Sequence, residues 1–289
     1  MSDKSGIEWT DATWNPTVGC TKVSAGCDHC YAENLVNRFA GTSPAFPTTF
    51  DIVNLRSDRF LTQPLRWSKP RRIFVNSLSD LFHKDVPDEF IARVFAVMVV
   101  TPRHTYQLLT KRHGRMRNLL GSHRFLGLLD EALTEHGERR LVADDWPLPN
   151  LWLGVSAEDQ HTADLRIPAL LETPAAVRWV SAEPLLGPIT FHRGHSHCPT
   201  HDFSSGFCMG RCPDLYTVDW IVAGGESGAQ ARPMESGWVR DIRDQCVANS
   251  IPFLFKQWGG RTPKVNGRTL DERTWDEYPT SSDASRVVR

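Results

Sequence analysis

The sequence lacks any long apolar segment and any surplus of charge. None of its 289 residues belongs to an uninterrupted apolar run of eighteen, which excludes a membrane-spanning helix. Residues 1–11 lack the apolar stretch of a signal peptide, so we expect a cytoplasmic protein with no membrane partner. The formal net charge is −1, so only local patches could attract nucleic acid or an anionic membrane.

A disulfide framework is excluded as well, because the cysteines number seven and the expected compartment is reducing. An apolar fraction of 40% and a charged fraction of 23% are ordinary for a soluble enzyme. The length allows one barrel-sized domain or two smaller ones. The cysteines fall into two groups of three, with Cys246 alone in a helical pattern, where it reads as a small buried apolar residue. This grouping favours metal ligands.

The amino-terminal cysteine group is the most informative stretch of the sequence. Cys20, Cys27 and Cys30 share one loop, separated by six residues and then by two. Thiolates this close repel one another unless a cation lies among them. Three cysteines suit a four-iron, four-sulfur cluster whose remaining iron binds a small molecule. A helix predicted from Tyr31 would direct its first amides toward the anionic cluster.

The second cysteine group predicts a closed, structural zinc site. Its predicted ligands are Cys198, His201, Cys208 and Cys212. The surrounding insertion, residues 192–216, has few apolar side chains, so a metal would have to supply its folding free energy. His195 or His197 can replace His201 as the nitrogen ligand. An auxiliary iron–sulfur cluster and a loop without metal are the alternatives.

Short apolar runs, each followed by a polar cluster, recur along the chain and begin roughly 25 to 45 residues apart. Such runs are typical of strands buried on both faces of a parallel sheet, and each gap has room for a crossover helix. The predicted strands are residues 72–76, 105–109, 151–155, 177–180, 220–223 and 252–255. Helices are predicted over residues 88–98, 159–171 and 237–248. A further strand before the cysteine loop gives about seven βα units.

These units predict an α/β fold, most economically a partial or closed βα barrel of the TIM type. An open, doubly wound sheet is the alternative, because the sequence does not give the strand order. Residues 1–259 would form the barrel, with insertions at 121–150 and 192–216. Residues 260–289 predict a hairpin that turns at Asn266–Gly267, followed by a polar tail. In such barrels the functional site lies at the carboxyl ends of the strands.

The cysteine loop resembles that of the radical S-adenosylmethionine (radical SAM) superfamily. Members have a partial α/β barrel and hold a four-iron, four-sulfur cluster through three cysteines after the first strand. The superfamily usually has three residues and then two between its cysteines, so only the Cys27–Cys30 spacing matches, and His29 stands where an aromatic is common. The motifs at residues 7–20, 72–83, 151–159, 177–188 and 221–228 resemble a family of phage and bacterial proteins of unknown function. That second resemblance covers nearly all of residues 6–280, and the family is often grouped with distant radical SAM relatives.

The radical SAM resemblance implies an enzyme. The open iron would bind the amino and carboxylate groups of S-adenosylmethionine, and an electron from the cluster would cleave its sulfonium. It also implies an electron donor such as a flavodoxin or ferredoxin, and we expect a monomer. A nucleic-acid base or a nucleotide is the hypothetical substrate, suggested by local basic clusters and by the phage resemblance.

The superfamily commonly holds the amino group of the cofactor with a Gly-Gly-Glu segment after its second strand. Here residues 224–226 have that sequence but follow a later strand, whereas Asp80 follows the second. Either Asp80 or Glu226 could accept from an ammonium group. The other predicted cofactor-binding residues are Asn76, Ser79, Ser156, Glu158, Gly224 and Gly225. The predicted catalytic residues are Glu183, Glu226 and Lys256, with a simple Glu183–Lys256 salt bridge as the alternative.

Basic residues gather in segments 56–72 and 111–117, near Trp67 and His113. They could grip a nucleic-acid backbone and stack on bases, or they could be solvated surface charge. A second hypothesis is therefore a non-catalytic, zinc-containing nucleic-acid-binding protein in which His29 completes the first zinc site. A zinc hydrolase is disfavoured, because three thiolates make zinc a poor Lewis acid.

Overall fold

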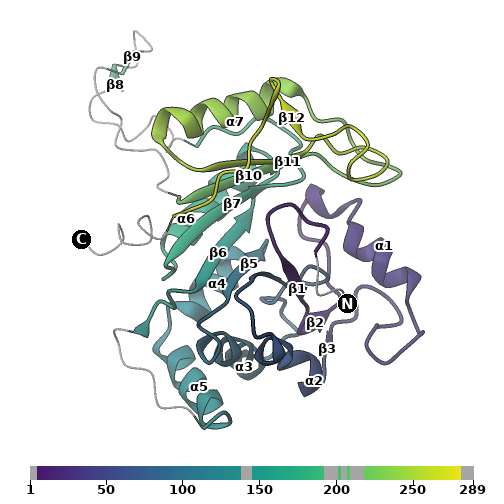
Figure 1. The fold of residues 1–289 in the computed structure, drawn as a ribbon, viewed down its shortest axis with the longest axis vertical. Coiled ribbons are helices and arrows are strands. Elements are labelled where there is room, and N and C mark those ends of the chain that lie inside the picture. The colour runs from purple at the N-terminus through teal and green to yellow at the C-terminus, as the bar shows by residue number, and fades with distance from the viewer. Residues whose placement is uncertain (1–4, 138–144, 192–200, 203–206, 209–217, 281–289) are drawn as a thin grey trace.

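The computed structural model describes residues 5–137, 145–191, 201–202, 207–208 and 218–280. Its centre is a parallel sheet of seven strands that curls into a half-barrel (Figure 1). In spatial order the strands are β1 (Ala12–Trp14), β4 (Arg72–Val75), β5 (Thr105–Thr110), β6 (Leu151–Ser156), β7 (Val177–Ala182), β10 (Trp220–Gly224) and β11 (Phe253–Gln257). Within the described residues no pairing joins β1 to β11, so the half-barrel is open rather than closed.

The predicted strands are confirmed, because each apolar run is buried on both faces of the sheet. All five residues of β10 are buried, for example. The doubly wound alternative is wrong, since such sheets reverse their strand order at a switch point. Here the spatial order follows the chain without a reversal, and every neighbouring pair is parallel.

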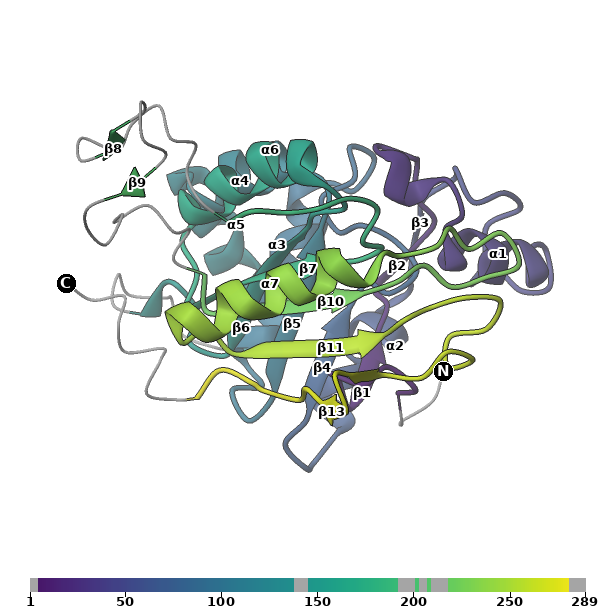
Figure 2. The ribbon, with the colours of Figure 1, turned by 90° about the horizontal axis from the view of Figure 1, so that it is seen from above.

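Helices pack on the outer face of the sheet and connect consecutive strands. The longer ones are α3 (Asp88–Val99), α4 (His113–Leu120), α5 (His123–Thr134), α6 (Gln160–Leu171) and α7 (Ser236–Asn249). The three predicted crossover helices are therefore confirmed. Asp159 starts α6 with a capping box to Thr162, which satisfies amides of its first turn. Figure 2 shows α7 lying along β10 and β11.

Side chains of the strands alternate between the main core and the concave face of the half-barrel. Ile73 and Val75 join the main core, whereas Phe74 points to the concave face. There Phe74 packs with Trp9, at 4.6 Å between ring centroids, in a cluster that includes Trp179 and Trp220. Because Trp220 begins its strand, this aromatic cluster forms a floor beneath the carboxyl ends of the sheet.

The amino-terminal loop is tied to the sheet by a small second ladder. Strand β2 (Thr17–Val18) pairs antiparallel with β3 (Asn54–Leu55), which a short helix, α2 (Asp58–Leu61), follows. The cysteine loop starts after β2 and ends at Cys30. Helix α1 (Tyr31–Arg38) begins at the next residue, as predicted, and Cys30 is its N-cap.

The predicted turn of the carboxyl-terminal hairpin is wrong. The hairpin consists of β12 (Thr269–Leu270) and β13 (Arg273–Thr274). It therefore turns at Asp271–Glu272 and not at Asn266–Gly267. Asp271 and Glu272 have φ values of 50° and 61°, the left-handed conformation that such a turn requires. Arg240 and Arg243 of α7 donate to the Asp271 carboxylate and hold the turn in place.

The predicted zinc site falls largely outside the described residues. Cys198 and Cys212 belong to ranges that the structure does not describe. Strands β8 (His201–Asp202) and β9 (Phe207–Cys208) pair antiparallel, with His201 opposite Cys208. The site therefore stays a prediction. Among the described residues, none of the helices has the length and apolarity that crossing a bilayer requires.

Candidate functional site

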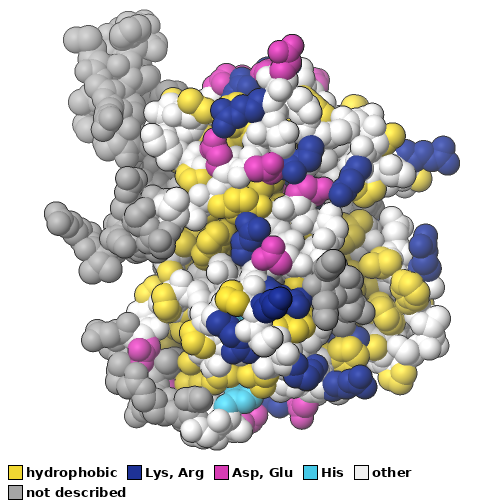
Figure 3. Space-filling model, in the orientation of Figure 1, with side chains coloured by type: hydrophobic (Ala, Val, Ile, Leu, Met, Phe, Trp, Pro, Cys, Tyr) yellow, Lys and Arg dark blue, Asp and Glu magenta, His cyan; other side chains and the backbone are white. Residues whose placement is uncertain are grey.

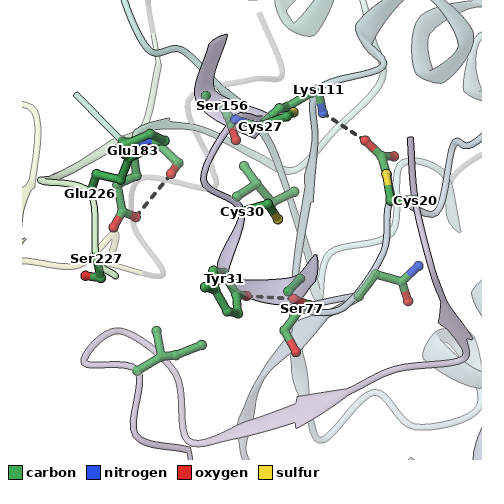
Figure 4. A pocket seen from close by; sticks show the side chains of 18 of the residues that line it. Cys20, Cys27, Cys30, Tyr31, Ser77, Lys111, Ser156, Glu183, Glu226 and Ser227 are labelled. Atoms are coloured by element: carbon green, nitrogen blue, oxygen red, sulfur yellow. Dashed lines mark hydrogen bonds between the residues drawn. The ribbon is translucent and has the colours of Figure 1, made fainter. Parts of the chain in front are cut away.

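A cavity of about 480 Å³ lies at the carboxyl ends of the strands. This volume is in the range of small-molecule sites. Figure 4 shows Cys20, Cys27 and Cys30 around it, together with groups from several strand ends. The predicted site residues that line it are Asn76, Ser79, Asp80, Ser156, Glu183, Gly225, Glu226 and Lys256. The structure thus brings most of the predicted site together, with Glu158 and Gly224 behind the cavity wall.

The environment of the cysteines differs from that of thiols in water. Burial raises the pKa of Cys20 to about 11, although Arg112 donates to its Sγ atom at 3.9 Å. Burial also raises the pKa of Cys30, against the effect of the Ala32 and Glu33 amides that bond its sulfur. Both thiols are therefore neutral near pH 7 unless a cation binds them.

The thiols fit an iron–sulfur cluster in their chemistry and in their shared location. Three cysteines line one cavity, and the first amides of α1 donate to one of them. Cys246, which belongs to neither cysteine group, is buried within α7, as expected. No group of three or more His, Cys, Asp or Glu side chains among the described residues is arranged to hold a metal ion. Cluster binding would therefore require the three thiols to draw together.

Asp80 uses its carboxylate to join the ends of two strands. Thr110 Oγ1 lies 2.7 and 2.9 Å from its two oxygens, and the amides of Phe82 and Lys111 each donate at 3.0 Å. Because a hydroxyl has a single hydrogen, these contacts come from three donors, which occupy three of about four acceptor positions of the carboxylate. Asp80 therefore has a structural role, and its predicted bond to an ammonium group stays a prediction.

Glu158 is buried in a network of positive charge. Its side chain is 1% exposed, Arg166 Nη1 lies 2.9 Å from Oε2, and Lys111 Nζ bonds Oε1. Burial alone would raise the pKa of Glu158, but Lys111 and Arg166 lower it to about 2. Gly26 of the cysteine loop packs against this carboxylate so closely that a Cβ atom would lie 2.4 Å from Oε1. Glu158 therefore supports the loop from behind.

Glu226 is likewise bound by the protein itself. Arg232 Nη2 lies 2.6 Å from its Oε1 atom, and His29 Nδ1 lies 3.1 Å from Oε2. Burial would raise the pKa of Glu226, but the hydrogen bonds from Arg232 hold it at about 2. Glu226 thus has a structural partner that does not depend on a cofactor.

The two glycines before Glu226 have a packing role. A Cβ atom on Gly225 would lie 2.0 Å from the carbonyl oxygen of Trp258, and one on Gly224 would lie 2.9 Å from Glu183 Oε1. Only glycine permits this approach of the chain after β10 to the chain after β11. This close approach accounts for Gly225, whereas an added Cβ at Gly224 would meet only the movable end of the Glu183 side chain. The predicted part of both glycines in cofactor binding stays a prediction.

Glu183 and Lys256 form the ion pair that was the alternative to separate catalytic roles. Lys256 Nζ lies 2.8 Å from Glu183 Oε1, and Ser181 Oγ donates to Oε2 at 3.1 Å. Both charged side chains line the cavity and keep some exposure, 13% for Glu183 and 21% for Lys256. An ammonium group has three donors, so Lys256 can bond a ligand and Glu183 together.

Comparison with known proteins identifies the family of the chain. A family model described as "Protein of unknown function (DUF5131)" matches residues 4–279. The chain belongs to the DUF5131 family. Searches of the curated proteins and of the solved structures gave no match. The matched segment of this DUF5131 member contains the cysteine loop, all seven strands of the sheet and the cavity, but the description of the family assigns no reaction to them.

The basic residues of the second cluster in this DUF5131 protein form ion pairs with acids of the same chain, at buried and at exposed positions. Arg115 lies 2.6 Å from Asp88, Arg117 lies 2.8 Å from Glu172, and Lys111 bonds Glu158. On the face drawn in Figure 3, basic side chains are interspersed with acidic and apolar ones. These pairings favour a structural interpretation of the cluster over a nucleic-acid grip.

Sequence reasoning missed three arginines of the site, Arg112, Arg166 and Arg232. Arg166 had a detectable signal, because it lies on the buried face of α6 between apolar positions and so requires a buried acid. Arg112 lies within the basic segment 111–117, and the sequence gives no reason to separate it from the other basic residues there. Arg232 had no local signal, since its distant partners are about 200 residues away in the sequence.

Proposed function

We propose that the chain is an iron–sulfur enzyme of the radical SAM type that reductively cleaves S-adenosylmethionine. The observation that carries this proposal is the arrangement of Cys20, Cys27 and Cys30 on the wall of one cavity at the carboxyl ends of a parallel half-barrel. Those cysteines would hold a four-iron, four-sulfur cluster. When bound, such a cluster supplies the electron that cleaves the sulfonium of the cofactor.

The other cavity residues supply binding and exclude water. Among the described residues, Glu183 is the single carboxylate that pairs with Lys256. The remaining donors of the Lys256 ammonium group therefore suit a carboxylate or phosphate of a ligand. Ser156 adds a hydroxyl to the same wall. Trp9 and Phe74 form an apolar base that keeps water from a reactive intermediate.

We further propose a nucleic-acid base or a nucleotide as the substrate, and a flavodoxin or ferredoxin as the electron donor of a monomeric enzyme. The apolar atoms of Trp9 and Phe74 at the cavity floor support this substrate class, because a planar base can lie against an apolar surface. Lys256 would then pair with a phosphate or with an acceptor on the base.

The test is anaerobic reconstitution with iron and sulfide, followed by reduction in the presence of S-adenosylmethionine. We expect a brown protein that releases 5′-deoxyadenosine. The same protein with all three loop cysteines replaced by serine is the control, and it should do neither. A colourless wild-type protein that carries zinc alone would contradict the proposal and would instead indicate a non-catalytic zinc protein that binds nucleic acid.

A further inference from the structure

The cysteine loop is held at its start by a side chain from the end of β5. Arg112 Nη2 donates to the hydroxyl of Thr21 at 2.8 Å and to its carbonyl oxygen at 3.0 Å. The same guanidinium reaches the Cys20 sulfur. Cys20 is also fixed through its backbone, since its amide donates to the carbonyl of Phe50 at 2.7 Å. Thr21 Oγ1 also lies 2.9 Å from His83 Nε2, so Arg112 and His83 together hold this first half of the loop, residues 20–22.

The second half of the loop, residues 24–30, is held from the opposite side of the half-barrel mouth. Arg232, in the segment between β10 and α7, donates to the carbonyl oxygen of Ala25 at 2.8 Å. It also pairs with Asp28 at 3.4 Å. These two contacts bracket Cys27, and Asp28 lies two residues before Cys30. At the start of this half, Ser24 Oγ donates to Glu158 Oε1 at 2.9 Å.

Arg232 is itself aligned by Glu226, whose side chain is only 4% exposed. Three donors of Arg232, its amide, Nε and Nη2, lie 2.9, 2.9 and 2.6 Å from the Glu226 carboxylate. Bidentate guanidinium–carboxylate bonds fix the plane of an arginine as well as its position. His29, within the loop, contacts the same carboxylate at 3.1 Å. The loop and the arginine thus share one buried anchor.

We propose that Arg232 and Glu226 are positioning residues that set Cys27 and Cys30 on the cavity wall, while Arg112 independently sets Cys20. The inference rests on the proposed function for its purpose, because a ligand loop already held at the cavity wall loses less conformational freedom when a metal cluster binds. It assigns Glu226 to the support of the loop and not to the chemical step. It also explains why a carboxylate follows Gly225, without invoking a cofactor.

The experiment compares Arg232→Gln, Arg232→Lys and Arg112→Gln in the metal-free protein by amide hydrogen exchange. We expect Arg232→Gln to speed exchange at Cys27 and Asp28 about tenfold, because their loop hydrogen bonds then open more often. Residues 20–22 should keep their wild-type rates. Arg112→Gln should give the reverse pattern, and Arg232→Lys, which keeps one charge but loses the planar fork, should fall between wild type and Arg232→Gln.

The matched control is Arg240→Gln, which removes an arginine that pairs with Asp271 away from the cavity. It should leave exchange in both halves of the loop unchanged. Wild-type rates at residues 24–30 in Arg232→Gln would overturn the inference. So would a uniform acceleration across the strands of the sheet, because that would indicate general destabilisation.

A spectroscopic measurement then connects this positioning to the metal. After anaerobic reconstitution with iron and sulfide, we expect the reduced Arg232→Gln protein to show an altered electron paramagnetic resonance signal, with the Arg232→Lys signal closer to that of the wild type. An unaltered signal in Arg232→Gln would contradict the inference. If the wild type takes up no iron, the proposed function fails, whereas hydrogen exchange still decides whether Arg232 positions the loop.

Discussion

At the scale of single residues, the arginines that pair with the buried acids of the site determine the pKa values of those acids. Glu158 and Glu226 each have an arginine within 2.9 Å, and their pKa values are both held at about 2. Sequence reasoning found these acids because polar residues follow each apolar run. From the sequence alone, these acids are assigned to a cofactor, because no rule of residue spacing connects an acid with the arginine that pairs with it.

The cysteines give the most direct prediction at this scale. Replacement of Cys20, Cys27 or Cys30 by serine should abolish the iron content of the reconstituted protein, because each removes one of three ligands. Cys246→Ala, which changes a thiol buried in α7, should retain it. The measurement is iron and acid-labile sulfide per chain. Retention of full iron by any of the three serine variants would remove that cysteine from the ligand set.

Glu158 predicts a specific acid sensitivity. Its pKa is lower in the folded chain, about 2 against an ordinary 4.5, so the folded state gains stability above pH 4.5 and loses it as the pH falls toward 2. The shift corresponds to on the order of 3 kcal/mol. Glu158→Gln should therefore lower the urea midpoint at pH 7 and make it depend less on pH between 5 and 3. Glu172→Gln, at an exposed acid, is the control and should keep the wild-type profile.

Lys256 predicts a separable effect on ligand binding. Lys256→Met should leave the melting temperature within about 3 °C of wild type, because the ion pair with Glu183 is partly exposed and contributes little. It should weaken binding of S-adenosylmethionine or substrate about tenfold or more, because a charged donor is lost. Isothermal calorimetry measures this. Lys84→Met, at an exposed ion pair with Asp85 whose two residues do not line the cavity, should bind normally.

At the scale of elements, strands were predictable and tight turns were not. An apolar run such as Trp220–Gly224 specifies a strand because both of its faces are buried. The turn at Asp271–Glu272 lacks glycine, and arginines 28 and 31 residues away stabilise it. A local pattern cannot report a partner at that distance, so the Asn-Gly pair nearby gave the wrong turn.

The junction between β10 and β11 gives a prediction at the scale of elements. Gly225→Ala should cost about 3 kcal/mol, because its Cβ would lie 2.0 Å from the backbone oxygen of Trp258 and the chain must shift. Gly114→Ala in α4 is the matched control, with nothing within 4 Å of the added atom. It should stabilise the chain by about 0.5 to 1 kcal/mol. Thermal unfolding distinguishes the two, and equal melting temperatures would show that the junction yields easily.

At the scale of the whole molecule, the sequence predicts the succession of βα units but not how far the sheet closes. Closure would require pairing between β1 and β11, and the sequence of neither strand shows that this pairing is missing. The location of the site was predictable, since the carboxyl ends of parallel strands always meet at one rim. The partners that lock the cysteine loop were not, because they come from three different units.

Long-range bonds also determine when the site can exist. Arg232 and Asp28, which meet at the rim, are separated by 204 positions, and Tyr278 donates to the carbonyl of Glu8 across 270. A ribosome adds about 5 to 20 residues each second, so the loop emerges well before its anchors. During that interval its thiols are unsupported and open to oxidation or to stray metals. Delivery of the proposed cluster would therefore be productive only after synthesis of the later units, which favours insertion into a finished chain over capture during translation.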